Sequence, residues 1–185
     1  MSHHSMHSAP PYTYRDYCTW DDAERWELLD GIPYLMASPT PEHQSILLNI
    51  ATAFHAALQG TDCIPFVSPL DVTFEASDDT RTVVQPDVFV MCGTFGHDSR
   101  IVGVPTLVVE ILSPSTAAHD TIRKLNLYQQ MGVLEYWIVE PDTQLVNQYR
   151  YDGTLLRWLR AIPMGEAITS DVLPKLTANT RVFFS

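Results

Sequence analysis

The stretch from Thr106 to Val139 constrains the fold more than any other part of the chain. It begins with Thr106–Leu112, a run of Leu, Val and Ile with a single Glu, which favours a strand buried on both faces. The turn and cap residues Ser113-Pro114-Ser115-Thr116 then precede a predicted helix at roughly Ala117–Met131. A second apolar strand is expected at Leu134–Val139. This order of strand, helix and strand predicts two parallel neighbours in one sheet.

Hairpins are predicted at two Asp-Gly pairs, because both turn positions of a tight hairpin must tolerate a positive φ. Asp30-Gly31 separates Arg25–Leu29 from Ile32–Met36, and Asp152-Gly153 separates two further strand-like runs. The other expected elements are a short helix, a long helix and three strands: Thr13–Trp20, Glu42–Gln59, Cys63–Val67, Leu70–Glu75 and Pro86–Met91. One more short strand at most is expected in the tail. Together these elements predict an α/β fold with a mixed central β-sheet flanked by helices.

A chain of 185 residues is expected to form one domain, here residues 12–185, after a flexible His- and Ser-rich leader at residues 1–11. No apolar run approaches the roughly twenty residues that span a bilayer, and none is typical of a signal peptide, so no membrane association is expected. The three cysteines are odd in number, widely spaced and form no C-x-x-C pair: Cys18, Cys63 and Cys92. They are therefore expected to be reduced thiols in a cytoplasmic protein.

The charge balance argues against a general nucleic-acid binder. Eleven Lys and Arg stand against twenty-two Asp and Glu, which gives a formal net charge of −11. Proteins that hold nucleic acid usually show a basic stripe, because their affinity comes from neutralising phosphates. No continuous basic run is visible, so a nucleic-acid substrate requires a local patch, a bound cation or a dimer groove.

Two acids stand in strongly apolar strands. Glu110 is the only charged residue in Val104–Leu112, and Asp87 follows Pro86 at the start of another apolar run. An ionised carboxylate that is buried without a partner is costly, so such a group is paired, protonated or bound to a cation. A strand-end Glu that reaches solvent or a structural Arg, and an Asp that merely begins a strand, remain the alternatives. Two carboxylates on neighbouring buried strands favour a cation between them.

Three further polar residues are candidates for the same site. Glu27 lies between bulky apolar residues, although an exposed position on a two-sided strand explains it equally well. Lys124 shares a helix face with Tyr128, and a surface ion pair with Asp120 is its alternative explanation. His43 begins the long helix, where it either lines the site or faces solvent. A lysine beside several acids would neutralise their charge or hold an attacking water.

Five sequence segments and the hairpin after them closely resemble the Uma-two (Uma2) family, which is assigned to the restriction-endonuclease-like PD-(D/E)xK superfamily. The segments are WELLDG, SPTPEHQ, VVQPDVFV, VVEILSPST and RKLNLYQQMGVLEYWIVEP. The resemblance covers roughly Tyr12 to Leu156, with the motifs in the family's order. It implies a restriction-endonuclease-like fold and an active site of acids and one lysine.

The resemblance assigns roles residue by residue. Asp87 matches the Asp of the PD motif and Glu110 the acid of the next motif. Lys124 matches the family's lysine on the following helix, because position 112 is Leu and the usual E-x-K spacing is absent. Glu27 matches the N-terminal acid. Positions expected to line the pocket are His43, Gln85 and Tyr128.

A Mg²⁺-dependent endonuclease is therefore the preferred hypothesis, with Mn²⁺ as a possible substitute and nucleic acid, DNA rather than RNA, as the substrate. Asp87, Glu110 and Glu27 would hold the ion, and Lys124 would orient water or stabilise charge on phosphorus. The alternative is a catalytically silent module of the same fold that acts through protein contacts. A homodimer is expected in either case. The candidate dimer surface consists of apolar and aromatic residues of the C-terminal hairpin: Tyr149, Tyr151, Leu155, Leu156, Trp158 and Leu159. The alternative is that these side chains pack in the core. The costly buried acids favour the enzyme.

Overall fold

The computed structural model describes residues 11–20, 24–113 and 117–185. Its helices are α1 (Tyr14–Tyr17), α2 (Pro41–Leu58), α3 (Ala117–Met131) and the 3-10 turn η1 (Thr180–Val182). Its strands are β1 (Trp26–Leu29), β2 (Ile32–Leu35), β3 (Cys63–Val67), β4 (Val72–Thr73), β5 (Val88–Cys92), β6 (Ile101–Val102), β7 (Leu107–Ile111), β8 (Glu135–Glu140), β9 (Leu145–Tyr151), β10 (Leu156–Pro163), β11 (Ala167–Thr169) and β12 (Thr177–Asn179).

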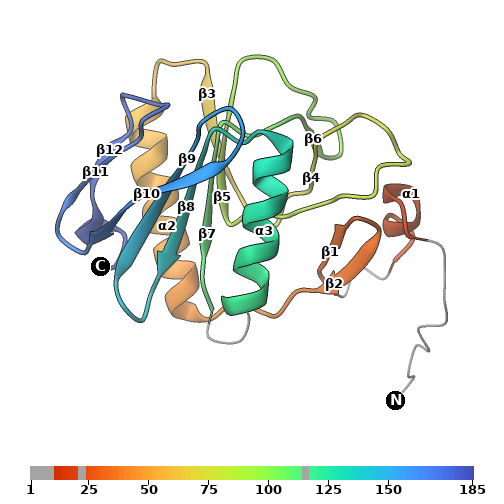
Figure 1. Cartoon of the computed structure of the whole chain (residues 1–185), viewed down its shortest axis with the longest axis horizontal. Coiled ribbons are helices and arrows are strands. Elements are labelled where there is room, and N and C mark those ends of the chain that lie inside the picture. Colours follow the sequence, from red (N-terminus) through yellow and green to blue (C-terminus); the bar gives the residue numbers. More distant parts are fainter. Residues whose placement is uncertain (1–10, 21–23, 114–116) are drawn as a thin grey trace.

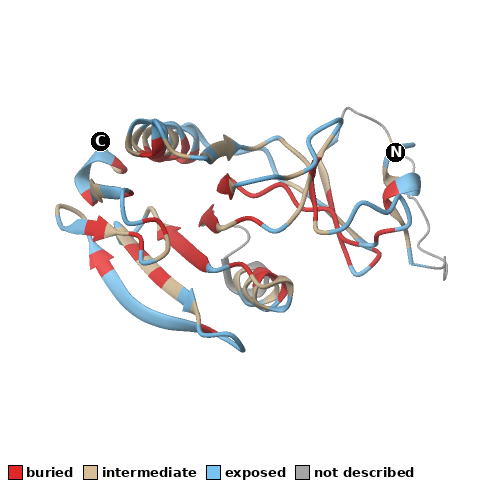
Figure 2. Cartoon of the chain, turned by 90° about the horizontal axis from the view of Figure 1, so that it is seen from above, coloured by how far each residue is buried: buried red, intermediate tan, exposed pale blue. Residues whose placement is uncertain are grey.

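A six-stranded mixed sheet forms the centre of the molecule, in the order β10-β9-β8-β7-β5-β3. β7 and β8 are parallel neighbours joined by α3, and the other adjacent pairs are antiparallel. α2 covers one face of this sheet and α3 the other (Figures 1 and 2). The predicted mixed α/β sheet flanked by helices is thus confirmed, including the parallel pair across the strand–helix–strand unit.

Strand alternation sorts the core into two layers. Val88 and Val109 belong to the cluster that contains the buried face of α2, whereas Phe89 and Val108 belong to the cluster on the α3 side. Because successive side chains of a strand point to opposite faces, Glu110 lies on the same face as Val108, toward α3. The sequence pattern of β7 therefore directs its single charge toward one particular helix.

Both predicted hairpins form, but the expected positive φ at both turn positions is found only at Asp30-Gly31; in the β9–β10 connection Gly153 has a φ of 99° and Asp152 does not have a positive φ. Asp30 and Gly31 have φ of 52° and 80°, and β1 pairs with β2 across them. Thr13 caps α1 and Thr40 caps α2, and the apolar side chains along one face of α2 are buried. Two predicted features, the cap at Pro114–Thr116 and most of the leader, lie outside the described residues.

The prediction of three reduced thiols is wrong for two of them. Cys63 and Cys92 form a disulfide, and only Cys18 is a free cysteine. The two stand directly opposite each other in the antiparallel β3–β5 pair, with their Cα atoms 4.0 Å apart. Cross-strand neighbours of this kind can be bridged, but the 29 residues between them in sequence hide the pairing.

The second half of the chain also differs in detail from the expectation. The tail contains two short strands, β11 and β12, where at most one was expected. Each of them pairs with the other, so neither forms alone. In the candidate self-association hairpin Leu156 is buried, whereas Trp158 is 56% exposed and Leu155 and Leu159 are also exposed. No helix within the described residues is long and apolar enough to cross a membrane.

Candidate active site

The ends of β5 and β7 bring two acids together. Val88 pairs with Val109 in the antiparallel β5–β7 register, so the next step places Asp87 opposite Glu110. Asp87 is 9% exposed and Glu110 7%. Asp87 Oδ2 accepts a 2.8 Å hydrogen bond from the backbone N–H of Ile111, which fixes the Asp87 carboxylate beside the end of β7.

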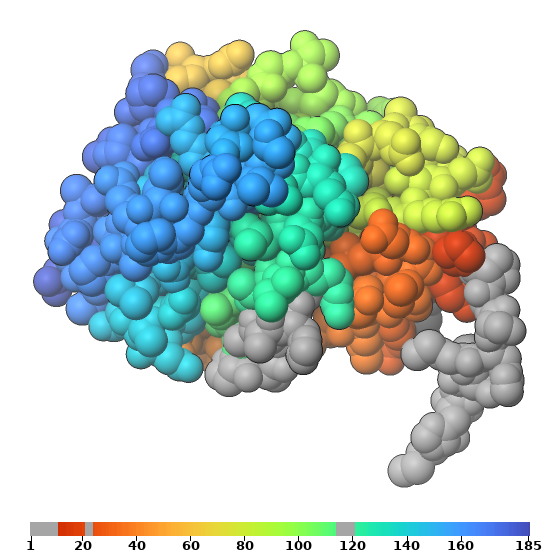
Figure 3. Space-filling view, viewed as in Figure 1, coloured from red at the N-terminus to blue at the C-terminus, as the bar shows by residue number. Residues whose placement is uncertain are grey.

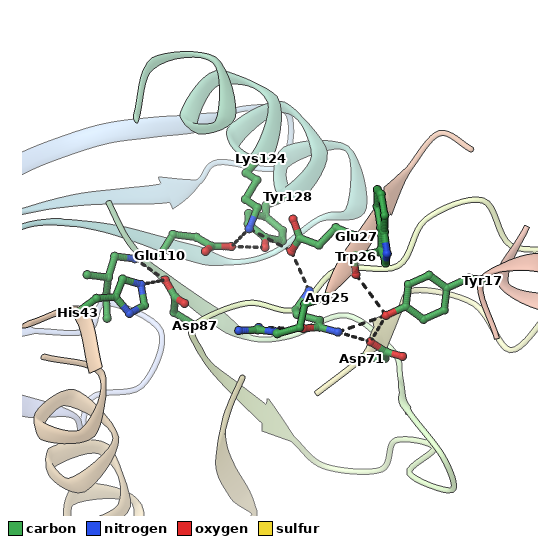
Figure 4. Close-up of polar contacts among 12 residues, drawn as sticks. Tyr17, Arg25, Trp26, Glu27, His43, Asp71, Asp87, Glu110, Lys124 and Tyr128 are labelled. Carbon is green, nitrogen blue, oxygen red and sulfur yellow. Dashed lines mark hydrogen bonds and ion pairs between the residues drawn. The ribbon is translucent and has the colours of Figure 1, made fainter. Parts of the chain in front are cut away.

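Lys124 and Tyr128 reach Glu110 from α3, one helical turn apart. Lys124 Nζ lies 3.0 Å from Glu110 Oε1 and 3.1 Å from Glu27 Oε1, and the Tyr128 hydroxyl donates to Glu110 Oε1 at 2.7 Å (Figure 4). All four side chains are buried, so Glu27 is not an exposed strand residue. The side chain of Asp120 lies outside the described residues, and the alternative ion pair with Lys124 stays untested.

Glu27 arrives on the β1–β2 hairpin, which lies against α3 in the space-filling view (Figure 3). The Arg123 guanidinium of α3 lies 4.2 Å from the centre of the Tyr34 ring on β2, a cation–π contact between the two elements. Glu27 Oε1 also accepts a 2.8 Å hydrogen bond from the backbone N–H of Gln85. The hairpin thus carries the third acid to the same lysine.

His43 contacts Asp87 from the first turn of α2. Its Nε2 lies 3.2 Å from Asp87 Oδ2, and its Nδ1 is buried with no hydrogen-bond partner within the described residues. His43 therefore lines the site and does not face solvent. All seven residues predicted from the sequence lie in this neighbourhood, in two groups of contacts that meet at the neighbouring positions Glu110 and Ile111.

Three residues of this neighbourhood were not predicted as site residues: Tyr17, Arg25 and Asp71. The side chain of Gln85 links them, because its Oε1 accepts from Arg25 and its Nε2 donates to Asp71 Oδ1 at 2.9 Å and to the Tyr17 hydroxyl at 3.2 Å. Arg25 carries one sequence signal: it stands two residues before Glu27, where a strand directs both side chains to the same face.

Burial and charge shift the titration of the site. Burial raises the pKa of Glu110 to about 8; Lys124 and the Tyr128 hydroxyl oppose this shift, and the negative charges of Asp87 and Glu27 add to it. Burial alone would lower the pKa of His43, but its hydrogen bond to Asp87 and the charges of Asp87 and Glu110 outweigh burial and raise it. Burial thus favours the protonated, neutral form of Glu110, and the neighbouring acids favour the protonated, charged form of His43.

A second buried acid shows what a purely structural carboxylate looks like in this fold. Glu135 is fully buried, and its two oxygens accept four hydrogen bonds, from Trp137, Gln148, Ser170 and the backbone N–H of Val172. Glu110, by contrast, accepts both of its bonds on Oε1, and within the described residues its Oε2 has no partner. Asp87 Oδ1 is also without a partner there.

These open oxygens fit a hard divalent cation. No three His, Cys, Asp or Glu side chains of the described residues are grouped so as to hold a metal ion by themselves. Mg²⁺, however, is usually bound through one or two carboxylates, with water and substrate phosphate completing its shell. Asp87 and Glu110 match that donor set. Glu27 Oε1 is already occupied by Lys124 and Gln85, and its role as a direct ligand stays a prediction.

Comparison with known proteins bears on the family and on the fold. The model of the Uma2 family, described as "Putative restriction endonuclease", matches residues 12–181. An uncharacterized protein of Synechocystis sp. is 30% identical over 148 residues, which cover 78% of this chain and 76% of that protein. A crystal structure of "a putative nuclease belonging to DUF820" from Anabaena variabilis superposes with a TM-score of 0.73 at 16% identity, covering 94% of this chain and 98% of that one. At 16% identity this similarity is evidence for the fold alone, and that fold is the one expected from the sequence.

Proposed function

Because this chain belongs to the Uma2 restriction-endonuclease family, we propose that it is a Mg²⁺-dependent endonuclease that hydrolyses phosphodiester bonds of DNA. The observation that carries the proposal is the pair Asp87 and Glu110. These two carboxylates are buried on adjacent strands, each keeps one oxygen without a partner among the described residues, and the pKa of Glu110 is raised. A carboxylate pair in this state favours a bound cation.

Asp87 and Glu110 would hold Mg²⁺ or Mn²⁺ through their open oxygens. The ion, when bound, supplies Lewis-acid polarisation of a phosphodiester and favours attack by water at neutral pH. His43 and the backbone N–H of Ile111 orient Asp87, and the Tyr128 hydroxyl orients Glu110. Such supporting contacts fix the direction in which each carboxylate presents its remaining oxygen.

Lys124 supplies the fixed positive charge of the site. Its ammonium group donates hydrogen bonds to Glu27 and to Glu110. Glu27, which is held by Gln85, keeps the ammonium beside Glu110. From that position Lys124 would donate to the attacking water or to a phosphoryl oxygen on which charge develops.

A calorimetric Mn²⁺ titration tests the metal centre without knowledge of the substrate. We expect one binding site in the parent, its loss in Asp87→Asn and Glu110→Gln, and its retention in the control Glu140→Gln on β8. Glu140 is a suitable control because its carboxylate contacts Thr143 and Asn147 and not the site. Binding that survives in both site variants would contradict the assignment.

Cleavage of plasmid DNA with Mg²⁺, with Mn²⁺ and with EDTA tests the reaction. We expect nicking that requires a divalent ion and disappears in Lys124→Ala, although this variant still binds Mn²⁺. An RNA substrate in parallel tests the choice of DNA. A parent that neither binds Mn²⁺ nor cleaves either polymer would favour the alternative, a silent module that acts through protein contacts.

The proposal includes a homodimer. A large exposed aromatic on an edge strand, Trp158 on β10, is typical of an interaction surface. Sedimentation velocity should therefore give twice the mass of the chain. Trp158→Glu should shift the species toward the monomer, and a parent that sediments as a monomer would remove this part of the proposal.

A further inference from the structure

We propose that Arg25 binds a phosphodiester group of the substrate beside the carboxylate pair. The inference rests on the proposed function, and it adds a residue that would hold the nucleic-acid backbone. It also answers the objection raised by the net charge of −11, because a polyanion can approach such a chain only where positive charge is locally available.

The guanidinium of Arg25 is partly buried and has no carboxylate partner among the described residues. Its Nε and Nη2 both donate to one neutral oxygen, Gln85 Oε1, at 3.1 and 2.8 Å. Several other arginines of the chain pair with aspartates instead: Arg15 with Asp79, Arg100 with Asp78, Arg150 with Asp171 and Arg157 with Asp152. No carboxylate of the described residues therefore neutralises the positive charge of Arg25.

The network around Gln85 fixes the direction of this cation. The Gln85 amide can be oriented in only one way, because Asp71 only accepts hydrogen bonds and a guanidinium only donates them. Nε2 of Gln85 therefore faces Asp71, and its Oε1 faces Arg25. The same contacts hold the guanidinium in place, and this positioning lowers the entropy lost when it binds a ligand.

Three N–H donors of Arg25 remain for a ligand, one on Nη2 and two on Nη1. Within the described residues, the one buried side-chain nitrogen or oxygen without a hydrogen bond is His43 Nδ1. Nη1 of Arg25, which has no partner among the described residues, is therefore not fully enclosed, and the second N–H of Nη2 belongs to the same guanidinium edge. Two donors on adjacent nitrogens form the fork that matches two oxygens of a phosphate group.

The position of Arg25 relative to the acids follows from shared contacts. Gln85 holds the guanidinium with its side chain and Glu27 with its backbone N–H, and it stands two residues before Asp87. Figure 4 shows Arg25 in the same close-up as Asp87, Glu110, Lys124 and Glu27. A phosphodiester that reaches the open oxygens of the acids through a divalent ion would therefore lie near the free edge of Arg25.

The competing explanation is that Arg25 only anchors Gln85 and so supports Glu27. A structural role and a phosphate contact differ in their dependence on salt. A side chain that neutralises one phosphate contributes about 0.9 to the slope of log K against log salt concentration, and a purely structural residue contributes nothing to that slope.

The test is fluorescence anisotropy with a short fluorescein-labelled DNA duplex, in Ca²⁺ to limit hydrolysis, over a series of NaCl concentrations. We compare the parent with Arg25→Gln, with Arg25→Lys and with Arg150→Gln, a control that removes one positive charge from the exposed pair on β9. We expect Arg25→Gln to bind roughly ten- to a hundredfold more weakly, with a slope smaller in magnitude by about 0.9. Arg25→Lys should keep the slope and lose part of the affinity, because it keeps the charge and loses the fork. Arg150→Gln should match the parent.

The outcomes separate this inference from the proposed function. If the parent binds and cleaves DNA and Arg25→Gln binds with the parent's slope, the Arg25 contact is wrong and the nuclease remains. If Arg25→Gln shows the expected loss but the parent cleaves nothing in Mg²⁺ or Mn²⁺, the contact stands and the nuclease proposal fails. A parent that does not bind the duplex overturns both. If Arg25→Gln does not fold, an unchanged affinity in Arg25→Lys overturns the contact and a partial loss at constant slope supports it.

Discussion

Glu110 links the pH dependence of stability to the metal site. Its pKa in the fold, about 8, lies above the value of 4.5 that is ordinary for a Glu side chain. Between these two values the folded chain holds a proton that the unfolded chain has released, so the free energy of unfolding falls as pH rises through this window. Below about pH 4.5 both states are protonated, and the contribution of Glu110 is at its most favourable.

We therefore expect the parent, in EDTA, to lose stability from about pH 5 to pH 8 more steeply than Glu110→Gln, whose amide does not titrate. Urea denaturation at a series of pH values measures the two curves. Mn²⁺ should restore stability to the parent at the upper end of this range, because the ion binds only the ionised carboxylate. Parallel curves for the two proteins would show that Glu110 titrates normally.

His43 is expected to influence metal binding indirectly, by orienting the Asp87 carboxylate. Its Nε2 lies 3.2 Å from Asp87 Oδ2, so His43→Ala removes a group that orients the carboxylate. Loss of such a supporting contact typically weakens metal binding about 10- to 100-fold. Calorimetric Mn²⁺ titration measures the change, and His55→Ala, an exposed histidine on the same helix, is the control. Equal affinities in the two variants would mean that Asp87 needs no support from α2.

The acids of the site were predictable because each is a charge in a segment whose other residues require burial. Glu135 breaks the same rule but was not singled out, and only the structure shows that its carboxylate is fully satisfied by four donors. Arg25 was not predicted as a site residue either, because an arginine next to a hairpin strand is ordinary. Its significance depends on Gln85, sixty residues away.

At the scale of elements, the sequence predicts those helices, strands and turns that depend on residues close together in the chain. Asp30-Gly31 fixes the β1–β2 hairpin, and the apolar runs on either side of α3 fix the parallel β7–β8 pair. β6 and one of the two tail strands, β11 and β12, were missed, since strands of two or three residues form only through pairing with other strands. The Cys63–Cys92 disulfide was missed for the same reason, because it depends on the β3–β5 register.

The disulfide joins the edge strand β3 to β5, and we expect it to stabilise the fold without contributing to the site. Closing a loop of about thirty residues restricts the unfolded chain by roughly 3–4 kcal/mol in the chain-entropy description. Cys63→Ser with Cys92→Ser should lower the free energy of unfolding by up to about that amount and leave Mn²⁺ affinity unchanged. Thiol titration of the parent, denatured without reductant, should find Cys18 alone. Three titratable thiols would contradict the bridge.

At the scale of the whole molecule, net charge and the arrangement of the arginines act together. Ion pairs among the described residues include four Arg–Asp pairs outside the site, which compensate charges that could otherwise attract a polyanion. The chain still carries eleven more acidic than basic residues. At the proposed site, attraction for DNA would come from Arg25, Lys124 and a bound divalent ion.

This distribution of charge predicts a weak dependence of DNA binding on monovalent salt and a strong dependence on divalent ions. If about three phosphates or fewer are neutralised, the slope of log K against log salt should not exceed about 3 in magnitude. Removal of divalent ions with EDTA should abolish binding, because the uncompensated carboxylates then repel the backbone. Anisotropy titrations of the parent in Ca²⁺ and in EDTA measure both effects. A slope steeper than about 5, or equal affinity in EDTA, would instead require a basic surface that holds several phosphates, such as one formed between two copies of the chain.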